Sequence, residues 1–191
     1  MKGFTLIEAM VAVAILAISV TAPTYGASRT LVATQNANNQ LTASYLAQEG
    51  VEYARVYRDS YYLGARQFAK STASVDAWNV FQSNVVTTCR ESAGSAGCAL
   101  EPLTPYTPFV TCGGTCPKLY LKKSTGEYTT QTAGNVATIY TRTIKMDLVS
   151  TKNAAGIDVN DEVRVTSTVS WDFHGKTYRV EIVSSLTRWL P

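Results

Sequence analysis

Four cysteines are the residues of this 191-residue sequence with the plainest capacity for covalent chemistry. Cys89, Cys98, Cys112 and Cys116 fall in one window that is rich in Gly, Ser, Thr and Pro. An even number of cysteines in such a window predicts disulfide bonds and an oxidising compartment. Four cysteines allow three connectivities, which sequence does not decide between, although the short separations favour Cys89 with Cys98 and Cys112 with Cys116.

A zinc site is the alternative for the same four cysteines. The spacing of Cys112 and Cys116 falls within the range of zinc ligands, but Cys89 and Cys98 are further apart and the only histidine, His174, is remote in sequence. We therefore expect disulfides, with no metal and no cofactor.

His174 is the one imidazole that could serve as a catalytic base, and it stands beside Gly175 between two alternating segments. That placement predicts an exposed residue of a hairpin turn. No serine or cysteine is spaced with a candidate base, no glycine-rich phosphate loop follows a strand, and no carboxylate cluster suggests a metal. The sequence therefore predicts a protein that is not an enzyme.

Composition predicts a globular protein without the basic surface that is typical of nucleic-acid-binding proteins. The 46 % of apolar residues supplies material for a packed core. The 17 basic and 14 acidic residues give a net charge of +3 without any run of like charges, so we expect no specific binding of nucleic acid.

Glu8 is the only charge in the apolar run of residues 4–20, and residues 4–27 are long enough to span a bilayer as a single pass. A carboxylate at that depth costs about 3 kcal/mol unless it is protonated or paired. An ordinary secretory signal is cut after its apolar region. Here the small residue Gly3 precedes that region, so a cut after Gly3 would keep it and give Phe4 a free amino group that could neutralise Glu8 of a neighbouring subunit.

The run Gly3-Phe4-Thr5-Leu6-Ile7-Glu8, followed by an apolar helix, resembles the prepilin motif of type IV pilins and type II secretion pseudopilins. The resemblance implies that a prepilin peptidase cuts between Gly3 and Phe4 and methylates Phe4, and that Glu8 assists docking of the subunit during assembly. Residues 1–3 are then the leader peptide.

The same resemblance implies the setting of the protein. The precursor is expected in the cytoplasmic (inner) membrane, and the processed subunit in an extracellular or periplasmic filament. Its partners would be other pilin subunits, the peptidase, an assembly platform and a motor ATPase. We expect a structural subunit, most simply a minor pilin. The alternatives are a minor pseudopilin of type II secretion and a tip-displayed adhesin or binding module that uses the cysteine-bearing insert.

The elements that must position these residues begin with one long helix. Pro23 lies inside it, removes a backbone hydrogen bond and predicts a kink. Residues 28–62 are expected to form an amphipathic half, because apolar and small residues follow one helical face. That face comprises Ala43, Leu46, Ala47, Gly50, Val51, Ala54 and Tyr57.

Residues 63–118 are expected to be an irregular insert that contains the cysteines, and residues 119–191 an antiparallel sheet. In the sheet, alternation on both sides of His174 and Gly175 predicts a hairpin in which Trp171 faces Tyr178, Val169 faces Val180 and Ser167 faces Ile182. Earlier strands are expected at residues 119–122, 127–130 and 137–149. The predicted fold is α+β and pilin-like: a long N-terminal helix packed on an antiparallel β-sheet.

Overall fold

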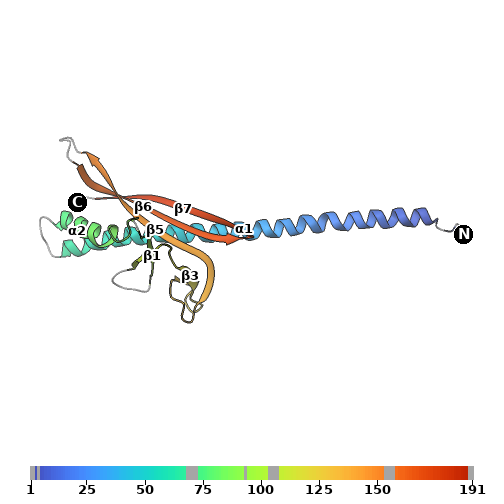
Figure 1. Cartoon of the computed structure of the whole chain (residues 1–191), viewed down its shortest axis with the longest axis horizontal. Helices are drawn as coiled ribbons and strands as arrows, with labels where there is room; N and C mark the ends of the chain where they lie inside the picture. Colours follow the sequence, from blue (N-terminus) through green and yellow to red (C-terminus); the bar gives the residue numbers. More distant parts are fainter. Residues whose placement is uncertain are drawn as a thin grey trace. The chain divides into compact units, whose positions relative to one another are not determined.

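The computed structural model of the chain describes residue 3 and residues 5–67, 73–92, 94–102, 108–152 and 158–188. The fold is α+β, as the sequence predicts, with a long N-terminal helix and an antiparallel sheet of seven strands (Figure 1). The chain divides into two compact units, Met1–Leu41 and Thr42–Pro191.

Helix α1 runs without interruption over Leu6–Gln67. It contains Pro23 and continues beyond it, so the kink expected at that residue remains a prediction. The asparagine-rich residues 35–40 are helical as expected, although asparagine has a lower helix propensity than alanine or leucine.

The part of α1 that belongs to the second unit is amphipathic, and the predicted apolar face is confirmed. Six of its seven members, from Ala43 to Ala54, are buried, while Tyr57 is half-buried. Small residues dominate this face, which allows the helix backbone to approach the sheet closely. At Gly50 an added Cβ would lie 2.5 Å from the Ser167 hydroxyl oxygen and 3.0 Å from Ile144 Cδ1.

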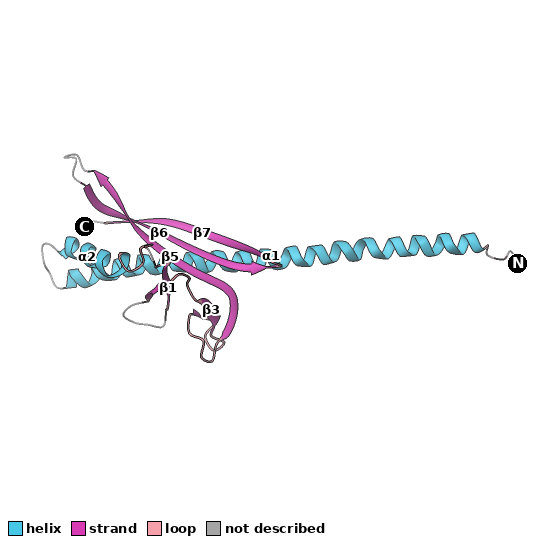
Figure 2. Ribbon diagram, viewed as in Figure 1, coloured by secondary structure: helices cyan, strands magenta, loops and turns pink. Residues whose placement is uncertain are grey.

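Three long antiparallel strands form the body of the sheet, and four short ones extend it (Figure 2). β5 pairs with β6, and β6 pairs with β7. On its other edge β5 pairs with β1 around Ile144 and with β3 nearer its start, and these in turn carry β2 and β4. The bounds are β1 Gly97–Leu100, β2 Phe109–Cys112, β3 Lys118–Leu121, β4 Tyr128–Thr129, β5 Val136–Lys152, β6 Asp158–Phe173 and β7 Lys176–Thr187.

The hairpin between β6 and β7 has the predicted register. Trp171 pairs with Tyr178, Val169 with Val180 and Ser167 with Ile182. The two turn residues, His174 and Gly175, both have positive φ, 49° and 75°. Two successive positive φ values are typical of a type I′ turn, whose twist matches that of the strands.

The expectation that residues 63–118 are irregular is wrong for the described part of that segment. It contains the end of α1, helix α2 over Ala73–Phe81, a π-helix over Gln82–Val86, and strands β1 and β2. Strand β1 is buried at all four positions, so it lacks the alternation that reveals a half-exposed strand. Tertiary packing therefore fixes these short elements, and local periodicity does not reveal them.

A buried carboxylate joins the end of β1 to the hairpin of β3 and β4. The Glu101 carboxylate accepts hydrogen bonds from the Thr129 hydroxyl at 2.8 Å, from the Thr130 backbone N–H at 2.9 Å and from the Thr130 hydroxyl at 2.6 Å. Glu101 is 4 % exposed, and these donors offset the desolvation of its charge.

Candidate anchoring and assembly segment

The start of α1 holds the residues that the sequence singles out for processing. Gly3 is exposed, and a Cβ built on it would meet nothing within 4 Å. Phe4, the expected new N-terminus, lies outside the described residues. The Thr5 carbonyl accepts from the backbone N–H groups of Glu8 at 3.1 Å and Ala9 at 3.2 Å, and so closes the first helical turn.

Glu8 lies in the first turn of α1 with its side chain exposed. A carboxylate there is favoured by the unpaired N–H groups and the positive end of the helix dipole. Within the part of the chain that the structure describes, no Lys or Arg lies within ion-pair distance of Glu8. Among the described residues, no cation of this chain neutralises its carboxylate.

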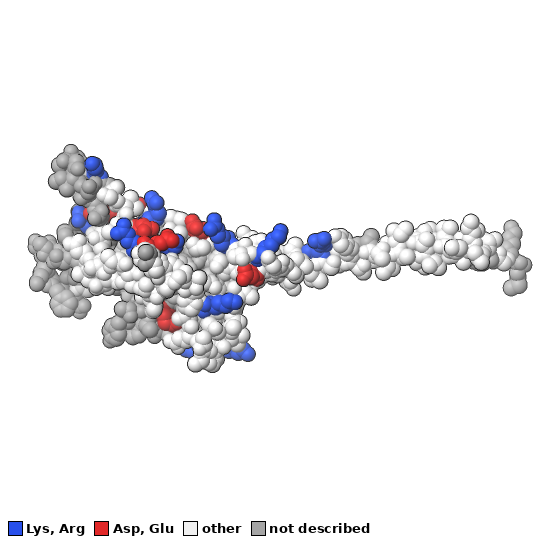
Figure 3. All heavy atoms as spheres, viewed as in Figure 1, with Lys and Arg blue, Asp and Glu red and all other residues white. Residues whose placement is uncertain are grey.

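The apolar residues that follow Glu8 are uncovered within the chain. Leu6, Ile7 and Ile18 are 79 %, 71 % and 69 % exposed. The helix is long and apolar enough to cross a membrane, with a mean hydropathy of 2.1 over its most apolar 18 residues, none of which is buried. On the face drawn in Figure 3 this segment carries no charge.

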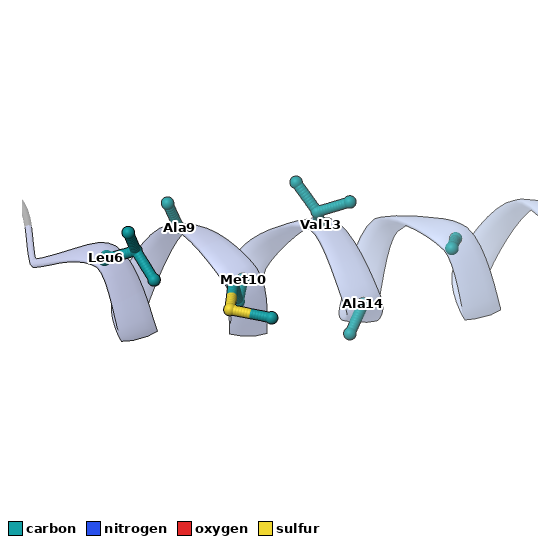
Figure 4. A pocket seen from close by; sticks show the side chains of 6 residues that line it. Leu6, Ala9, Met10, Val13 and Ala14 are labelled. Atoms are coloured by element: carbon teal, nitrogen blue, oxygen red, sulfur yellow. The ribbon is translucent and has the colours of Figure 1, made fainter.

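One face of the segment presents hydrocarbon and sulfur alone. Figure 4 shows Leu6, Ala9, Met10, Val13 and Ala14 pointing away from the ribbon, a mixture of large and small apolar side chains. Such a surface is unfavourable in water by roughly 25 cal/mol for each Å² left exposed. A bilayer or the matching helices of other subunits would remove that penalty.

The hydroxyl groups within this part of α1 are satisfied by the helix itself. The Thr21 hydroxyl donates to the Ala17 carbonyl at 2.9 Å, the Ser19 hydroxyl to the Leu16 carbonyl at 2.9 Å, and the Thr24 hydroxyl to the Val20 carbonyl at 3.0 Å. These bonds lie on both sides of Pro23. A helix whose polar side chains bond to its own backbone can enter an apolar phase without unpaired donors.

A tyrosine and an arginine mark the far end of the apolar stretch. Arg29 Nη2 donates to the Tyr25 hydroxyl at 2.8 Å, and the guanidinium lies 5.2 Å from the centre of the Tyr25 ring. Both side chains are amphipathic and favour the boundary between hydrocarbon and water. The sequence contained this signal, an aromatic and a basic residue four positions apart, but it was not among the predicted site residues.

An apolar helix without cover, with one acidic residue in its first turn and a glycine just before it, is the geometry that the prepilin resemblance requires. Residues 1–22 match the family model of the prokaryotic N-terminal methylation motif. The chain carries the signal motif of type IV pilins and pseudopilins. No curated protein and no solved structure matches the chain.

The pilin signal motif and the apolar helix together fit a membrane-anchored precursor of a structural protein. The motif match includes Gly3, Phe4, Glu8 and the apolar residues up to position 22. Pro23 lies just beyond it. The processing and docking roles of individual residues therefore remain predictions.

The cysteines lie in the other unit, away from the pilin motif in sequence, and the favoured pairing is confirmed. Cys89 is bonded to Cys98, and Cys112 to Cys116. The first disulfide lies in the main hydrophobic core, whereas the second lies with Ala99 in a small separate cluster. Both are structural cross-links, because all four sulfur-bearing residues are buried.

Sequence reasoning missed the charged pair that joins α1 to the sheet in the Thr42–Pro191 unit. Arg142 is fully buried and donates to Glu49, which lies outside the predicted apolar face of α1. A signal did exist. Arg142 has the same parity along β5 as Tyr140, Ile144 and Met146, which are all buried.

Proposed function

We propose that the chain is a structural subunit of a type IV pilus-like filament, specifically a minor pilin. The observation that carries the proposal is the apolar surface from Leu6 to Val20, which is exposed in the single chain and contains one charge, that of Glu8. Before assembly the bilayer covers it. After assembly the corresponding helices of other subunits do.

Processing precedes assembly in this proposal. The prepilin peptidase cuts between Gly3 and Phe4 and methylates the new amino group of Phe4. The lack of neighbours around Gly3 supports access by the peptidase. A larger side chain at that position would not clash with this chain, so any effect on cleavage would come from its fit in the peptidase. The assembly platform and the motor ATPase then lift the processed subunit into the filament.

Glu8 sets the axial position of the incoming subunit. Its carboxylate, unpaired among the described residues, attracts the Phe4 amine of a neighbour. In an apolar surrounding that attraction is much stronger than in water, and an unpaired Glu8 is costly. Subunits are thereby selected for the register in which the two charges meet.

The grounds for a minor pilin are the additional elements between α1 and the long strands. Helix α2, the π-helix, four short strands and two disulfides enlarge the part of the chain that a filament would display. A minor pseudopilin of type II secretion shares the motif and is the alternative within the same class.

The test is expression of Gly3 and Glu8 variants in the native host. Gly3→Leu should leave the full precursor in the membrane, seen as an uncut and unmethylated N-terminus by mass spectrometry. Glu8→Ala should be cut normally but be depleted from sheared filaments. Glu52→Ala, an exposed glutamate further along α1, is the matched control and should assemble. Normal incorporation of Glu8→Ala would contradict the docking role.

The same strains separate a pilin from a pseudopilin. Deletion of the gene should reduce surface pili while secreted enzymes still reach the medium. Loss of secretion with intact pili would assign the chain to a secretion pseudopilus instead.

A further inference from the structure

A cavity of about 360 Å³ lies between the second half of α1, the π-helix and the start of β2. All of its lining residues belong to the Thr42–Pro191 unit. The volume falls within the range of about 300–1,000 Å³ that is usual for small-molecule sites. The cavity shares no residue with the N-terminal segment, so anchoring and assembly do not account for it.

The lining combines aromatic rings with neutral hydrogen-bonding groups. None of the described residues around the cavity carries a charge. The rings and the polar groups are those of Tyr57, Tyr61, Phe109, Ser83, Asn84 and Thr88. A site for an anion, such as a nucleic-acid phosphate, would need cations here.

The aromatic wall is held in place by packing. The Tyr57 and Phe109 rings meet edge to face, with centroids 5.7 Å apart and planes at 83°. Tyr61, one helical turn beyond Tyr57, packs against Phe81 of the core at 6.2 Å. Rings fixed in this way offer a ligand an apolar surface with little loss of side-chain entropy.

The polar wall comes from the π-helix Gln82–Val86, whose wide turn closes with a hydrogen bond from the Thr87 N–H to the Gln82 carbonyl at 3.0 Å. Single π-turns are rare and occur frequently at functional sites. Ser83 and Asn84 lie in this turn, and both are exposed.

The hydroxyl groups beside the cavity are arranged as acceptors. The Ser83 hydroxyl donates to the Val80 carbonyl at 3.1 Å, and the Thr88 hydroxyl donates to the Asn84 carbonyl at 2.9 Å. With their protons directed to the backbone, both oxygens keep lone pairs for a donor from outside. The Asn84 amide adds two donors and an acceptor.

We propose that this cavity binds a neutral sugar residue of a glycan. A sugar ring has an apolar C–H face for the aromatic wall and hydroxyl groups that both donate and accept for the polar wall. A purely apolar ligand would leave the hydroxyl and amide groups of the site unpaired, which is unfavourable. A sugar would be the ligand of a subunit that is displayed on a filament. Binding can nevertheless be measured on the isolated chain, without filament assembly.

The test uses the full chain in detergent micelles. The probes are glucose, galactose, mannose and N-acetylglucosamine, each presented as an immobilised glycan and as a soluble competitor, with sialylated and sulfated glycans for comparison. We expect at least one neutral sugar to bind and to compete at millimolar concentration, and the acidic glycans to bind no better.

Two variants at exposed positions of the π-helix test the location. Asn84→Ala should weaken binding about 3- to 10-fold, the usual effect of losing one or two neutral hydrogen bonds. Ser83→Leu should fill the cavity and abolish binding. Asn79→Ala, at an exposed asparagine of α2 outside the cavity, should bind like the wild type.

Each outcome bears on the proposal. The proposal would be overturned if none of the neutral sugars bound at concentrations up to about 10 mM, because a dissociation constant above that value is a very weak affinity. Wild-type affinity in both Asn84→Ala and Ser83→Leu, or preferential binding of acidic glycans, would also overturn it. Glu8→Ala should bind sugar normally, so failure of the docking role and failure of this inference are distinguishable.

Discussion

The Oε2 atom of Glu49 lies 2.6 Å from Nη1 of Arg142, across the interface between α1 and β5. The Arg142 side chain is wholly buried, while that of Glu49 is 34 % exposed. The same Nη1 atom donates to the Leu46 carbonyl at 3.1 Å, and the Nε and Nη2 atoms have no hydrogen-bond partner among the described residues. Glu49 is therefore the principal compensation for a cation within the core.

Removal of Glu49 should be far more harmful than removal of an exposed glutamate. Glu49→Ala leaves the Arg142 charge buried and unpaired, which should lower the free energy of unfolding by about 3–5 kcal/mol. Denaturant unfolding of the full chain in detergent measures this loss through the fluorescence of Trp78 and Trp171, both buried.

The controls separate burial from charge. Glu52→Ala breaks an exposed ion pair with Arg55 and should change stability by no more than about 1 kcal/mol. Arg142→Met removes the buried charge and leaves the partly exposed Glu49 in contact with water, so its loss should be smaller than that of Glu49→Ala. Equal losses of stability in Glu49→Ala and Glu52→Ala would show that burial of Arg142 does not increase the energetic contribution of its ion pair with Glu49.

Gly50 should be intolerant of any side chain. A Cβ there would lie 2.5 Å from the Ser167 hydroxyl oxygen and 3.0 Å from Ile144 Cδ1, so these buried side chains or the helix must shift. We expect Gly50→Ala to lower the free energy of unfolding by about 1–3 kcal/mol, despite the higher helix propensity of alanine. The same denaturant unfolding checks it.

Gly64 is the matched control on the same helix, because a Cβ there meets nothing within 4 Å. Gly64→Ala should stabilise the protein by up to about 1 kcal/mol. Combining Gly50→Ala with Ser167→Ala removes the closest contact and should recover part of the loss. A stabilising Gly50→Ala would mean that the helix does not approach the sheet this closely.

Sequence periodicity predicted the elements that are half-exposed and regular. The face of α1 from Ala43 to Tyr57 and the register of the β6–β7 hairpin follow from the periods of 3.6 and 2, with His174 and Gly175 fixing the turn. The pilin signal motif was also predicted from the sequence, because an acidic residue in an apolar run has few explanations.

The parts that escaped prediction are fixed by contacts distant in sequence. Strand β1 is four residues long and buried throughout, so its pattern has no period, and it is held by Cys98, the Ile144 region of β5 and the Glu101 hydrogen bonds. Arg142 was missed because a basic residue at an inward-facing strand position can be predicted to be buried only when the carboxylate that pairs with it is known. That anion, Glu49, lies 93 positions earlier in the chain.

The two disulfides should contribute unequally to stability. The Cys89–Cys98 bond closes the larger loop, with a separation of 9 against 4 for Cys112–Cys116, and lies in the main core. By loop entropy we expect losses of about 3 kcal/mol for Cys89→Ala/Cys98→Ala and about 2 kcal/mol for Cys112→Ala/Cys116→Ala, with core burial widening the gap. Thermal unfolding of each double variant measures the order, and a larger loss for the second pair would contradict it.

Alkaline pH should destabilise the protein through Tyr140. Burial raises the pKa of the Tyr140 phenol above its ordinary value of 10.0, and the smaller opposing effect is a hydrogen bond with Thr42. The unfolded chain therefore loses this proton first, so the stability contribution is complete below about pH 10 and is lost as pH rises through the raised native pKa.

Tyr140→Phe should consequently give a shallower fall in the free energy of unfolding above about pH 10 than the wild type, even if it is less stable at neutral pH. Tyr45→Phe, at a position 62 % exposed, is the matched control for removal of a tyrosine hydroxyl outside the core. Denaturant unfolding at a series of pH values measures both. Identical slopes in the wild type and Tyr140→Phe would mean that the Tyr140 phenol ionises as readily in the folded protein as in the unfolded chain.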